Sequence, residues 1–485
     1  MNKILYISSE AFPLVKTGGL GDVAGSLPPA LLKLQQDIRI LLPAYQTVLD
    51  NLATKKVIAQ SSYNNIKVSI LETRLPGSKV KVWLVDCPML FDRPGGPYTD
   101  QHNQPWSDNA LRFAVFCYAA VDVALNKLTL NWRPTIVHCN DWQSGLVPAL
   151  LSLYKKPPAT IFTIHNLAYQ GNFDYQTFVD LKLPPELWHI DGLEFYNQLS
   201  FIKGGIAFAD KVTTVSPNYA QEIMQPEFGY GLDGLVKHRS DDVSGILNGI
   251  DEKYWNPGAD NHLVQKYNKR SLSNKQLNKL ALQKEFNLPV SETIPMIGMV
   301  SRIVEQKGFE LILQSLPELL EQPVQVVILG TGDSHYEIEL LNWHNNYPDK
   351  IVVTIGYSEV LAHQIEAASD LYLMPSTFEP CGLNQLYSLQ YGTLPIVTPV
   401  GGLADTVVHA SEEAITQKTA NGFVLEAATK QSLINTVHYA VQLFLQKEIW
   451  KQLQLNAMTA DHSWQASAVK YLELYKTAKN SLTTK

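Results

Sequence analysis

Residues 370–391 read DLYLMPSTFEPCGLNQLYSLQY and combine a strand, a tight turn and a helix. The first residues form a short apolar run typical of a buried strand, and apolar residues return at helical spacing after Asn384. Pro380 and Gly382 mark the turn, so Glu379 lies at the joint. Free backbone N–H groups at the start of such a helix favour an anion. A carboxylate beside an anion site suggests group transfer from a donor that carries phosphate.

Strand and helix patterns alternate throughout the second half of the chain. Apolar runs typical of strands occur at 295–301, 324–330, 351–355 and 394–398. Helical patterns lie between them at 309–320, 337–343 and 360–368. This alternation predicts an α/β domain with a parallel, doubly wound sheet.

The first half predicts a separate sheet. Strand patterns occupy 3–9, 38–42 and 211–216, two more begin at Thr135 and Thr160, and helical patterns lie at 23–34 and 111–125. Residues 67–75 and 79–86 predict an antiparallel hairpin. A polar segment marked by Gly and Pro, 240–261, indicates a domain boundary. We therefore expect domains at 1–245 and 246–462, and a last helix within 463–485 that packs back on the first domain.

The composition excludes several classes of protein. With 485 residues, 45% of them hydrophobic and 18% charged, the chain has the composition of an ordinary globular protein of two or three domains. The net charge of -7 argues against a nucleic-acid partner. No stretch approaches the roughly 20 apolar residues of a membrane span, and the N-terminus does not resemble a signal peptide. Four scattered cysteines favour reduced thiols and a cytoplasmic location.

A glycine-rich segment, KTGGLGD at 16–22, follows the first predicted strand. Gly19, Gly21 and Ala24 match the spacing of a dinucleotide-binding fingerprint, but about nine residues separate them from the strand that should directly precede them. The segment could be a turn that merely starts a helix. We favour a flexible loop whose amides and Lys16 bind a phosphate, because lysine is an effective point charge for phosphate oxygens.

Polar side chains follow two neighbouring strands of the first domain. Asp141 and Trp142 come after one strand, and His165 and Asn166 come after the next. Ligands of open α/β sheets bind beyond the carboxyl ends of the strands. A lone histidine is more often structural, but the pairing of His165 with Asp141 favours a functional site.

Arg302 and Lys307 follow the first strand of the second domain. They could be solvated surface cations, but their position in an acidic protein favours binding to a diphosphate. The chain contains no Asp-x-Asp motif and no convincing cluster of metal ligands in its sequence. We therefore expect no metal and no cofactor: fixed cations and amides would stabilise the leaving group. The charge of Glu379 suits sugar hydroxyls or an oxocarbenium-like sugar.

Six motifs, in order along the chain, resemble those of bacterial glycogen synthases and plant starch synthases. They are KTGGLGD at 16–22, HNLAYQG at 165–171, ILNGID at 246–251, SR at 301–302, QKG at 306–308 and FEPCGL at 378–383. The resemblance implies a GT-B fold, in which two Rossmann-like domains face each other across a cleft. It also implies retaining transfer of glucose from ADP-glucose to the 4-hydroxyl at the non-reducing end of an α-1,4-glucan.

The resemblance also implies roles for individual residues. Donor-binding residues would be Lys16, Gly18, Gly19, Asp22, Asn248, Cys381, Gly382 and Leu383. Catalytic residues would be Glu379, His165, Asp141, Arg302 and Lys307, with His165 near the reacting carbon. Acceptor-binding candidates are Tyr98, Trp142, Asn166 and Tyr169, although the aromatic ones could simply pack in loops.

The sequence also leaves alternatives open. Many relatives in the wider GT-B class carry a second Glu eight residues after the first, where this chain, like the glycogen synthases, has Tyr387. Other possible functions are a transferase that uses UDP-glucose, a non-catalytic glucan-binding protein and a nicotinamide oxidoreductase. A glycogen phosphorylase is also conceivable by fold, but no feature indicates a pyridoxal phosphate lysine. The choice between front-side and covalent mechanisms and the number of subunits stay open.

Overall fold

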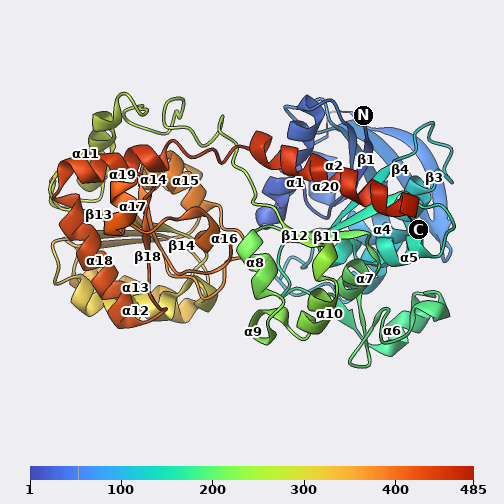
Figure 1. Cartoon of the computed structure of the whole chain (residues 1–485). Coiled ribbons are helices and arrows are strands. Elements are labelled where there is room, and N and C mark those ends of the chain that lie inside the picture. The colour runs from blue at the N-terminus through green and yellow to red at the C-terminus, as the bar shows by residue number, and fades with distance from the viewer. Residues whose placement is uncertain (53, 485) are drawn as a thin grey trace. The chain divides into compact units, whose positions relative to one another are not determined.

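The computed structural model describes residues 1–52 and 54–484, and they divide into two compact units. The first unit contains Met1–Gly249 and Trp464–Lys485, and the second contains Ile250–Ser463. The first unit ends at Gly249, four residues after the predicted boundary at 245. The chain returns to the first unit at Trp464, one residue after the predicted start of the last segment at 463. Each unit has its own α/β sheet (Figure 1).

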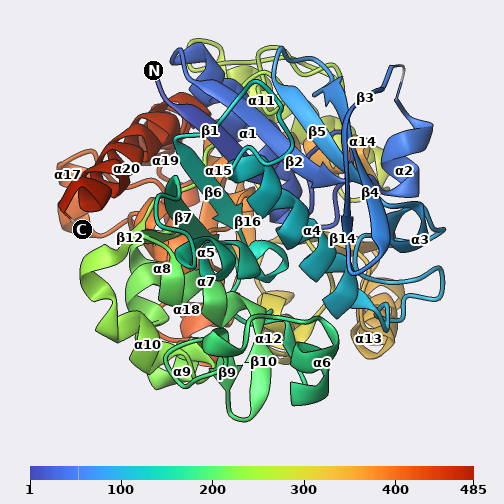
Figure 2. The same cartoon turned by 90° about the vertical axis from the view of Figure 1, so that its right-hand side faces the viewer.

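The sheet of the first unit has nine strands in the order β12-β11-β7-β6-β1-β2-β5-β4-β3 (Figure 2). Their bounds, in chain order, are β1 (Lys3–Ile7), β2 (Asp37–Pro43), β3 (Lys56–Tyr63), β4 (Ile66–Arg74), β5 (Lys81–Asp86), β6 (Ile136–Asn140), β7 (Ala159–Ile164), β11 (Lys211–Thr214) and β12 (Val243–Gly245). Neighbours from β12 to β5 are parallel, and β3, β4 and β5 pair antiparallel. The predicted hairpin is therefore present as β4 and β5.

Sequence patterns missed two strands of this sheet. The edge strand β3 has mostly exposed or half-buried side chains, so it lacks the apolar run of a buried strand. The strand β12 has only three residues and lies inside the polar segment that we interpreted as a boundary. Both are edge strands, where one side of the backbone has no partner strand and the pattern is weakest.

The first unit's long helices pack around this sheet. They are α1 (Gly19–Lys33), α4 (Asn109–Ala124), α5 (Leu146–Ser152), α7 (Phe201–Phe208) and α20 (Trp464–Thr484). The prediction that α1 begins near Val23 is wrong: the helix begins at Gly19, so part of the glycine-rich segment forms its first turn. The sequence was misleading because glycines have low helix propensity, whereas a first turn tolerates them.

The C-terminal helix α20 packs against α1 and β7, as predicted for a helix that returns to the first domain. One side of the helix is buried through Ala468, Tyr471, Tyr475 and Ala478, which recur at helical spacing. The Tyr475 hydroxyl lies 2.8 Å from Nδ1 of His138, a buried residue of β6. This contact fixes the helix on the sheet.

Shorter elements complete the first unit. A separate three-stranded antiparallel sheet contains β8 (Asn172–Phe173), β9 (Glu194–Phe195) and β10 (Gln198–Ser200). The remaining helices are α2 (Gln46–Asp50), α3 (Pro88–Phe91), α6 (Tyr175–Asp180), α8 (Pro217–Glu222), α9 (Pro226–Gly229) and α10 (Asp233–His238).

The second unit has a six-stranded parallel sheet in the order β15-β14-β13-β16-β17-β18. Its strands are β13 (Met296–Val300), β14 (Gln325–Gly330), β15 (Ile351–Ile355), β16 (Leu371–Met374), β17 (Leu394–Val397) and β18 (Phe423–Val424). Five of them match the predicted strand patterns, and the two-residue edge strand β18 was missed. Because β13 and β16 are neighbours in the middle of the sheet, the segments that follow them lie together.

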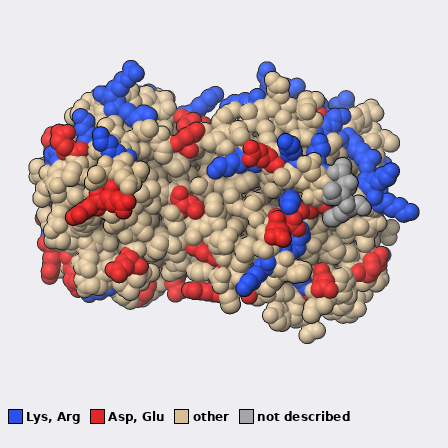
Figure 3. Space-filling model, viewed as in Figure 1, with Lys and Arg blue, Asp and Glu red and all other residues tan. Residues whose placement is uncertain are grey.

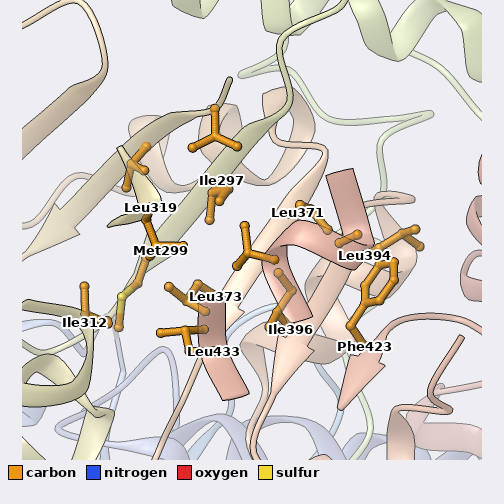
Figure 4. Packing of buried hydrophobic residues seen from close by; sticks show 14 of the residues in the cluster. Ile297, Met299, Ile312, Leu319, Leu371, Leu373, Leu394, Ile396, Phe423 and Leu433 are labelled. Atoms are coloured by element: carbon orange, nitrogen blue, oxygen red, sulfur yellow. The ribbon is translucent and has the colours of Figure 1, made fainter. Parts of the chain in front are cut away.

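Helices cover both faces of this sheet. They are α11 (Lys275–Glu285), α12 (Phe309–Leu319), α13 (Ser334–Asn346), α14 (Glu359–Ala368), α15 (Asn384–Gln390), α16 (Gly401–Thr406), α17 (Glu412–Thr416), α18 (Lys430–Phe444) and α19 (Lys447–Ala457). Alternate strand residues point to opposite faces. Ile297 and Met299 pack with Ile312 and Leu319 of α12 (Figure 4). Met296 packs with α11 and α14 on the other face. Each fully buried aliphatic side chain stabilises the sheet by about 1.5–3 kcal/mol.

Candidate active site

The segments that follow β13 and β16 bring Lys307 and Glu379 together. Lys307 Nζ donates to Glu379 Oε2 over 2.5 Å, and the Ser376 hydroxyl donates to the same oxygen over 3.2 Å. The two charged side chains are 17% and 10% exposed, so water screens this pair less than a surface pair. The carboxylate is therefore fixed in position, and its charge is balanced.

Further hydrogen bonds hold the two segments against each other. The Thr377 N–H donates to the Gln306 carbonyl over 2.9 Å, and Gln306 Nε2 donates to the Phe378 carbonyl over 3.1 Å. Arg302 lies close by and is exposed, and its Nη2 reaches Gln306 Oε1 at 3.5 Å. Gln306 therefore links the two predicted cations to the turn that carries Glu379.

A pair of glycines that was not among the predicted site residues packs against this turn. A Cβ on Gly401, which has φ of 43°, would lie 1.9 Å from the carbonyl oxygen of Glu379. A Cβ on Gly402 would lie 2.0 Å from the carbonyl oxygen of Cys381. No side chain fits at these distances, so only glycine allows the 379–381 backbone to pack here. The signal in the sequence was the adjacent glycine pair shortly after β17.

The helix α15 begins directly after this turn. Its first intrahelical hydrogen bond runs from Tyr387 N to Leu383 O, so the preceding N–H groups have no acceptor within the helix. Asn384 Nδ2 donates to Val300 O over 2.5 Å and to the Tyr372 hydroxyl over 2.8 Å. The helix start is thereby attached to β13 and β16. Gly382 and Leu383 lie beside Glu379, in the arrangement that the sequence predicted.

In the first unit, the buried carboxylate of Glu10 organises the glycine-rich segment. Its Oε2 accepts hydrogen bonds from the backbone N–H groups of Thr17, over 2.5 Å, and of Gly18, over 3.0 Å. Its Oε1 accepts from the Tyr98 hydroxyl over 2.6 Å. Burial raises the pKa of Glu10, against the effect of these hydrogen bonds. Glu10 was not among the predicted site residues, because nothing in the local sequence distinguishes it.

The other residues of the segment are more exposed. Lys16 Nζ lies 2.8 Å from Asp22 Oδ1, and the Lys16 side chain is 45% exposed. Ideal Cβ atoms on Gly18 and Gly19 would meet no atom within 4 Å, so a ligand can approach the backbone there. The predicted donor-binding residues of 16–22 therefore lie together at the start of α1.

Asp141 and His165 meet at the ends of β6 and β7. The His165 N–H donates to Asp141 Oδ1 over 2.7 Å, so the aspartate contacts the histidine backbone rather than its ring. The ring Nε2 lies 3.0 Å from Asn140 Oδ1, which acts as the acceptor. Asn140 was not among the predicted site residues.

Burial has opposite effects on these two groups. It raises the pKa of Asp141 to about 7, although hydrogen bonds from the backbone of His165 and Asn166 act against it. It lowers the pKa of His165 to about 3, so the imidazole is neutral. With Nε2 donating to Asn140, Nδ1 of His165 is left as an acceptor.

The aromatic acceptor candidates differ in their surroundings. The Trp142 ring lies edge-on to Phe113, with centroids 4.9 Å apart, and also contacts Phe173 and Phe201. The Tyr98 hydroxyl lies between Glu10 and Ser9 (Ser9 Oγ, 2.8 Å), whereas Tyr169 is 58% exposed. Part of the Trp142 ring is used in packing, and Tyr169 is the most exposed of the three rings.

The two remaining candidates lie in segments of the first unit outside its helices and strands. Asn166 Oδ1 accepts from the Ala168 N–H over 3.0 Å, which stabilises the turn after β7. Asn248 is only 5% exposed, and within residues 1–52 and 54–484 its Oδ1 has no hydrogen-bond partner. The predicted site residues thus form two clusters, one in each unit.

Comparison with known proteins identifies the family. Residues 3–238 match the family model of the starch synthase catalytic domain, and residues 282–451 match that of group 1 glycosyl transferases. The chain is 55% identical to the glycogen synthase of Cellvibrio japonicus over 477 residues, which cover 98% of this chain and 99% of the relative. It belongs to the glycogen synthase family.

Other relatives agree with this membership. Glycogen synthase 1 of Methylococcus capsulatus is 50% identical, with 98% of this chain and 96% of the relative covered. The catalytic domain of starch synthase IV from Arabidopsis thaliana, solved with ADP and acarbose, superposes with a TM-score of 0.88 at 32% identity, covering 99% of both chains. The GT-B fold expected from the sequence is thereby confirmed.

Three further observations concern metal binding, membrane crossing and surface charge. Among residues 1–52 and 54–484, no group of three His, Cys, Asp or Glu side chains is placed to hold a metal ion. Every helix among these described residues is too short or too polar to span a lipid bilayer. On the viewed face, acidic side chains lie among the basic ones in both units (Figure 3).

Proposed function

We propose that this member of the glycogen synthase family transfers glucose from ADP-glucose to the 4-hydroxyl at the non-reducing end of an α-1,4-glucan and releases ADP. Nucleotide sugar and glucan are the substrates of the family. The observation that carries the proposal is the fixed pair of Lys307 and Glu379 beside the start of α15. This arrangement combines a cation, a carboxylate and free amides, which suits a sugar attached to a diphosphate.

The cations and amides would bind the diphosphate. Lys307 uses one of its three N–H donors for Glu379, so two are left for phosphate oxygens. Arg302 is exposed nearby, with its Nη2 3.5 Å from Gln306 Oε1, and Gly382 and Leu383 offer backbone N–H groups. Charge-assisted hydrogen bonds of this kind contribute about 1.5–3 kcal/mol each. We propose that they stabilise the departing ADP without a metal ion.

Glu379 would hold the glucose of the donor. In the described residues, both side chains that contact its carboxylate use Oε2, which leaves Oε1 to accept hydrogen bonds from sugar hydroxyls. An ion-paired carboxylate is a weak nucleophile. We therefore propose that transfer is retaining and forms no glucosyl–enzyme bond.

In this mechanism the acceptor attacks on the face that the diphosphate leaves. The bond between acceptor O4 and glucose C1 forms while the bond between C1 and the β-phosphate oxygen breaks. The proton of O4 moves to that phosphate oxygen, and the positive charge that develops on the sugar is stabilised by the carboxylate.

We assign supporting roles to the first unit. The segment 16–22 and Asn248 would contact the donor, and the neutral His165 would offer Nδ1 to a glucose hydroxyl. Asp141 would fix the backbone that positions His165. Acceptor contacts are assigned to Tyr98, Trp142, Asn166 and Tyr169.

The nicotinamide alternative receives no support from the geometry. Gly19, Gly21 and Ala24 lie within α1, twelve or more residues after the end of β1, whereas the fingerprint requires them in the turn after the strand. The four cysteines are free and buried, which supports a cytoplasmic location, where thiols stay reduced. The net charge of -7 supports the expectation of no nucleic-acid partner.

The proposal is tested by incubating the purified chain with glycogen and either ADP-glucose or UDP-glucose. We expect release of nucleoside diphosphate, faster with ADP-glucose, together with incorporation of glucose into glycogen. A control without glycogen separates transfer from simple hydrolysis of the donor. Binding of glycogen with no release from either donor would indicate the non-catalytic alternative, and faster release from UDP-glucose would overturn the donor assignment.

A further inference from the structure

The second unit contains an open cavity beside its edge strand β18, apart from the motifs that define the family. Its volume is about 390 Å³, within the usual range of small-molecule sites. Its wall includes Ser432, Asn435 and Tyr439 from α18, at spacings of three, four and seven residues that place them on one side of the helix. His409 and Glu426 complete the wall from the segments that flank β18.

Two aromatic rings in this wall are held rigidly. The Val424 N–H donates to His409 Nδ1 over 3.0 Å, and the Tyr439 hydroxyl donates to the Ala410 carbonyl over 2.7 Å. The two rings stack, with centroids 6.1 Å apart and planes 27° from parallel. A ligand therefore meets a fixed aromatic surface, which lowers the entropy lost on binding.

Several polar groups of the wall can form hydrogen bonds in addition to those they make within the protein. The Ser432 oxygen accepts from the N–H groups of Glu426, over 3.0 Å, and Ala427, over 3.3 Å, which leaves its own hydrogen to donate. Asn435 Oδ1 accepts from Gln431 Nε2 over 2.8 Å, so the two hydrogens on Nδ2 are left to donate to a ligand. Within the described chain, the Glu426 carboxylate has neither an ion pair nor a hydrogen bond through its side chain.

The charges of the wall select among ligand classes. The lining residues include no lysine or arginine, and burial lowers the pKa of His409, so its ring is neutral. A phosphate or nucleotide would meet the Glu426 carboxylate without a cation to balance it. With Nδ1 of His409 accepting, Nε2 carries the ring proton and can donate. Donors, one carboxylate and flat rings together suit a neutral polyhydroxylated ligand.

We propose that this cavity binds a glucose unit of an α-glucan, as a second anchoring site in addition to the residues assigned to transfer. Hydroxyls of the sugar would donate to Glu426 and accept from Asn435 and Ser432, and its C–H face would pack on the aromatic surface. A long, branched glucan can occupy this site and the transfer site together, which raises its effective concentration, whereas a short acceptor cannot.

The test uses the double variant Glu426→Ala/Asn435→Ala of the full chain. Both side chains are exposed, so folding should be retained. The matched control is His438→Ala/Gln442→Ala, two exposed residues of the same helix that do not line the cavity. Hydrogen–deuterium exchange of residues 424–439 is measured with and without maltoheptaose, and apparent KM values are measured for glycogen and for maltose.

We expect maltoheptaose to slow exchange in 424–439 for the wild type and the control, but not for the double variant. The loss of two hydrogen bonds should raise the KM for glycogen roughly tenfold or more, with kcat and the KM for maltose unchanged. Unchanged exchange at saturating maltoheptaose would overturn the proposal, as would equal KM values for glycogen in the double variant and the control. The exchange measurement needs no turnover, so it would stand even if the proposed transfer reaction failed its own test.

Discussion

The two clusters of predicted site residues are built in different ways. In the second unit, Lys307 and Glu379 are contributed by neighbouring strand ends, and their opposite charges compensate each other directly. In the first unit, Glu10 is buried and Asp141 is half-buried. In the described residues neither carboxyl group has a cation on its oxygens, and backbone N–H groups hold them instead. The first arrangement suits binding of an anion, and the second suits positioning of loops.

This difference predicts different responses to mutation. Removing a charge from the second unit's pair should impair chemistry while the fold persists. Changing either of these two carboxyl groups of the first unit should alter loop geometry and the dependence of stability on pH. The following experiments test that contrast, beginning with the largest expected effect.

Replacing Lys307 by alanine should lower kcat by roughly a hundredfold or more, because it removes a cation from the departing diphosphate. It also leaves Glu379 without the cation that holds it. Initial rates of ADP release, with circular dichroism to verify folding, measure the effect. The matched control is Lys451→Ala, an exposed lysine on α19. Turnover equal to that of the control would remove Lys307 from the mechanism.

Replacing Glu10 by glutamine should lower kcat/KM by about tenfold. An amide of the same size has one acceptor oxygen, so it cannot accept from Tyr98 and from both N–H groups of 17–18 in the present geometry. Tyr98→Phe should reproduce part of this loss, since it removes one of the three hydrogen bonds. If Glu10→Gln lowers the unfolding free energy but leaves kcat/KM unchanged, the role of Glu10 is only structural.

Replacing Asp141 by asparagine should change how stability depends on pH. The folded-state pKa of Asp141, about 7, is raised above the unfolded value near 3.9, so burial of the ionised form destabilises the native state increasingly from about pH 4 to pH 7. Asparagine carries no such penalty. The unfolding free energy of the variant relative to the wild type should therefore rise by on the order of 2 kcal/mol between pH 4.5 and pH 8.

Chemical denaturation at several pH values measures this difference. His165 acts in the opposite direction in both proteins: its folded pKa, about 3, is below the unfolded value near 6.5, so stability is lost as the pH falls through that range. Because the variant retains His165, its effect cancels in the comparison. If the difference in unfolding free energy between the variant and the wild type is the same at pH 4.5 and at pH 8, Asp141 is already ionised in the folded wild type at pH 4.5.

The same contrast explains what the sequence could predict. In the second unit, the sequence predicted that Arg302, Lys307 and Glu379 lie near one another, because they belong to short motifs at strand ends and the strand–helix alternation places those ends together. The role of Gly401 and Gly402 was missed. These positions require glycine because the backbone of residues 379–381 approaches them closely, and no local sequence pattern reveals that approach.

In the first unit, sequence patterns located the polar strand ends but not their contacts. Asp141 and His165 were paired correctly, yet the contact runs through the backbone of His165, and its ring contacts Asn140. The link from Glu10 to Tyr98 joins residues 88 positions apart. Such long-range side-chain contacts depend on tertiary packing, which local periodicity does not specify.

The smallest expected effect concerns metal ions. If fixed cations and amides stabilise the departing diphosphate, as the surroundings of Lys307 suggest, chelation should change the rate by less than about twofold. The measurement compares initial rates of ADP release before and after dialysis against EDTA, with and without added Mg²⁺. A loss of activity that Mg²⁺ restores would mean that a divalent ion shares the diphosphate charge. In that case Lys307→Ala should lose less activity when Mg²⁺ is abundant, and the contrast between the two clusters would be weaker than their contacts indicate.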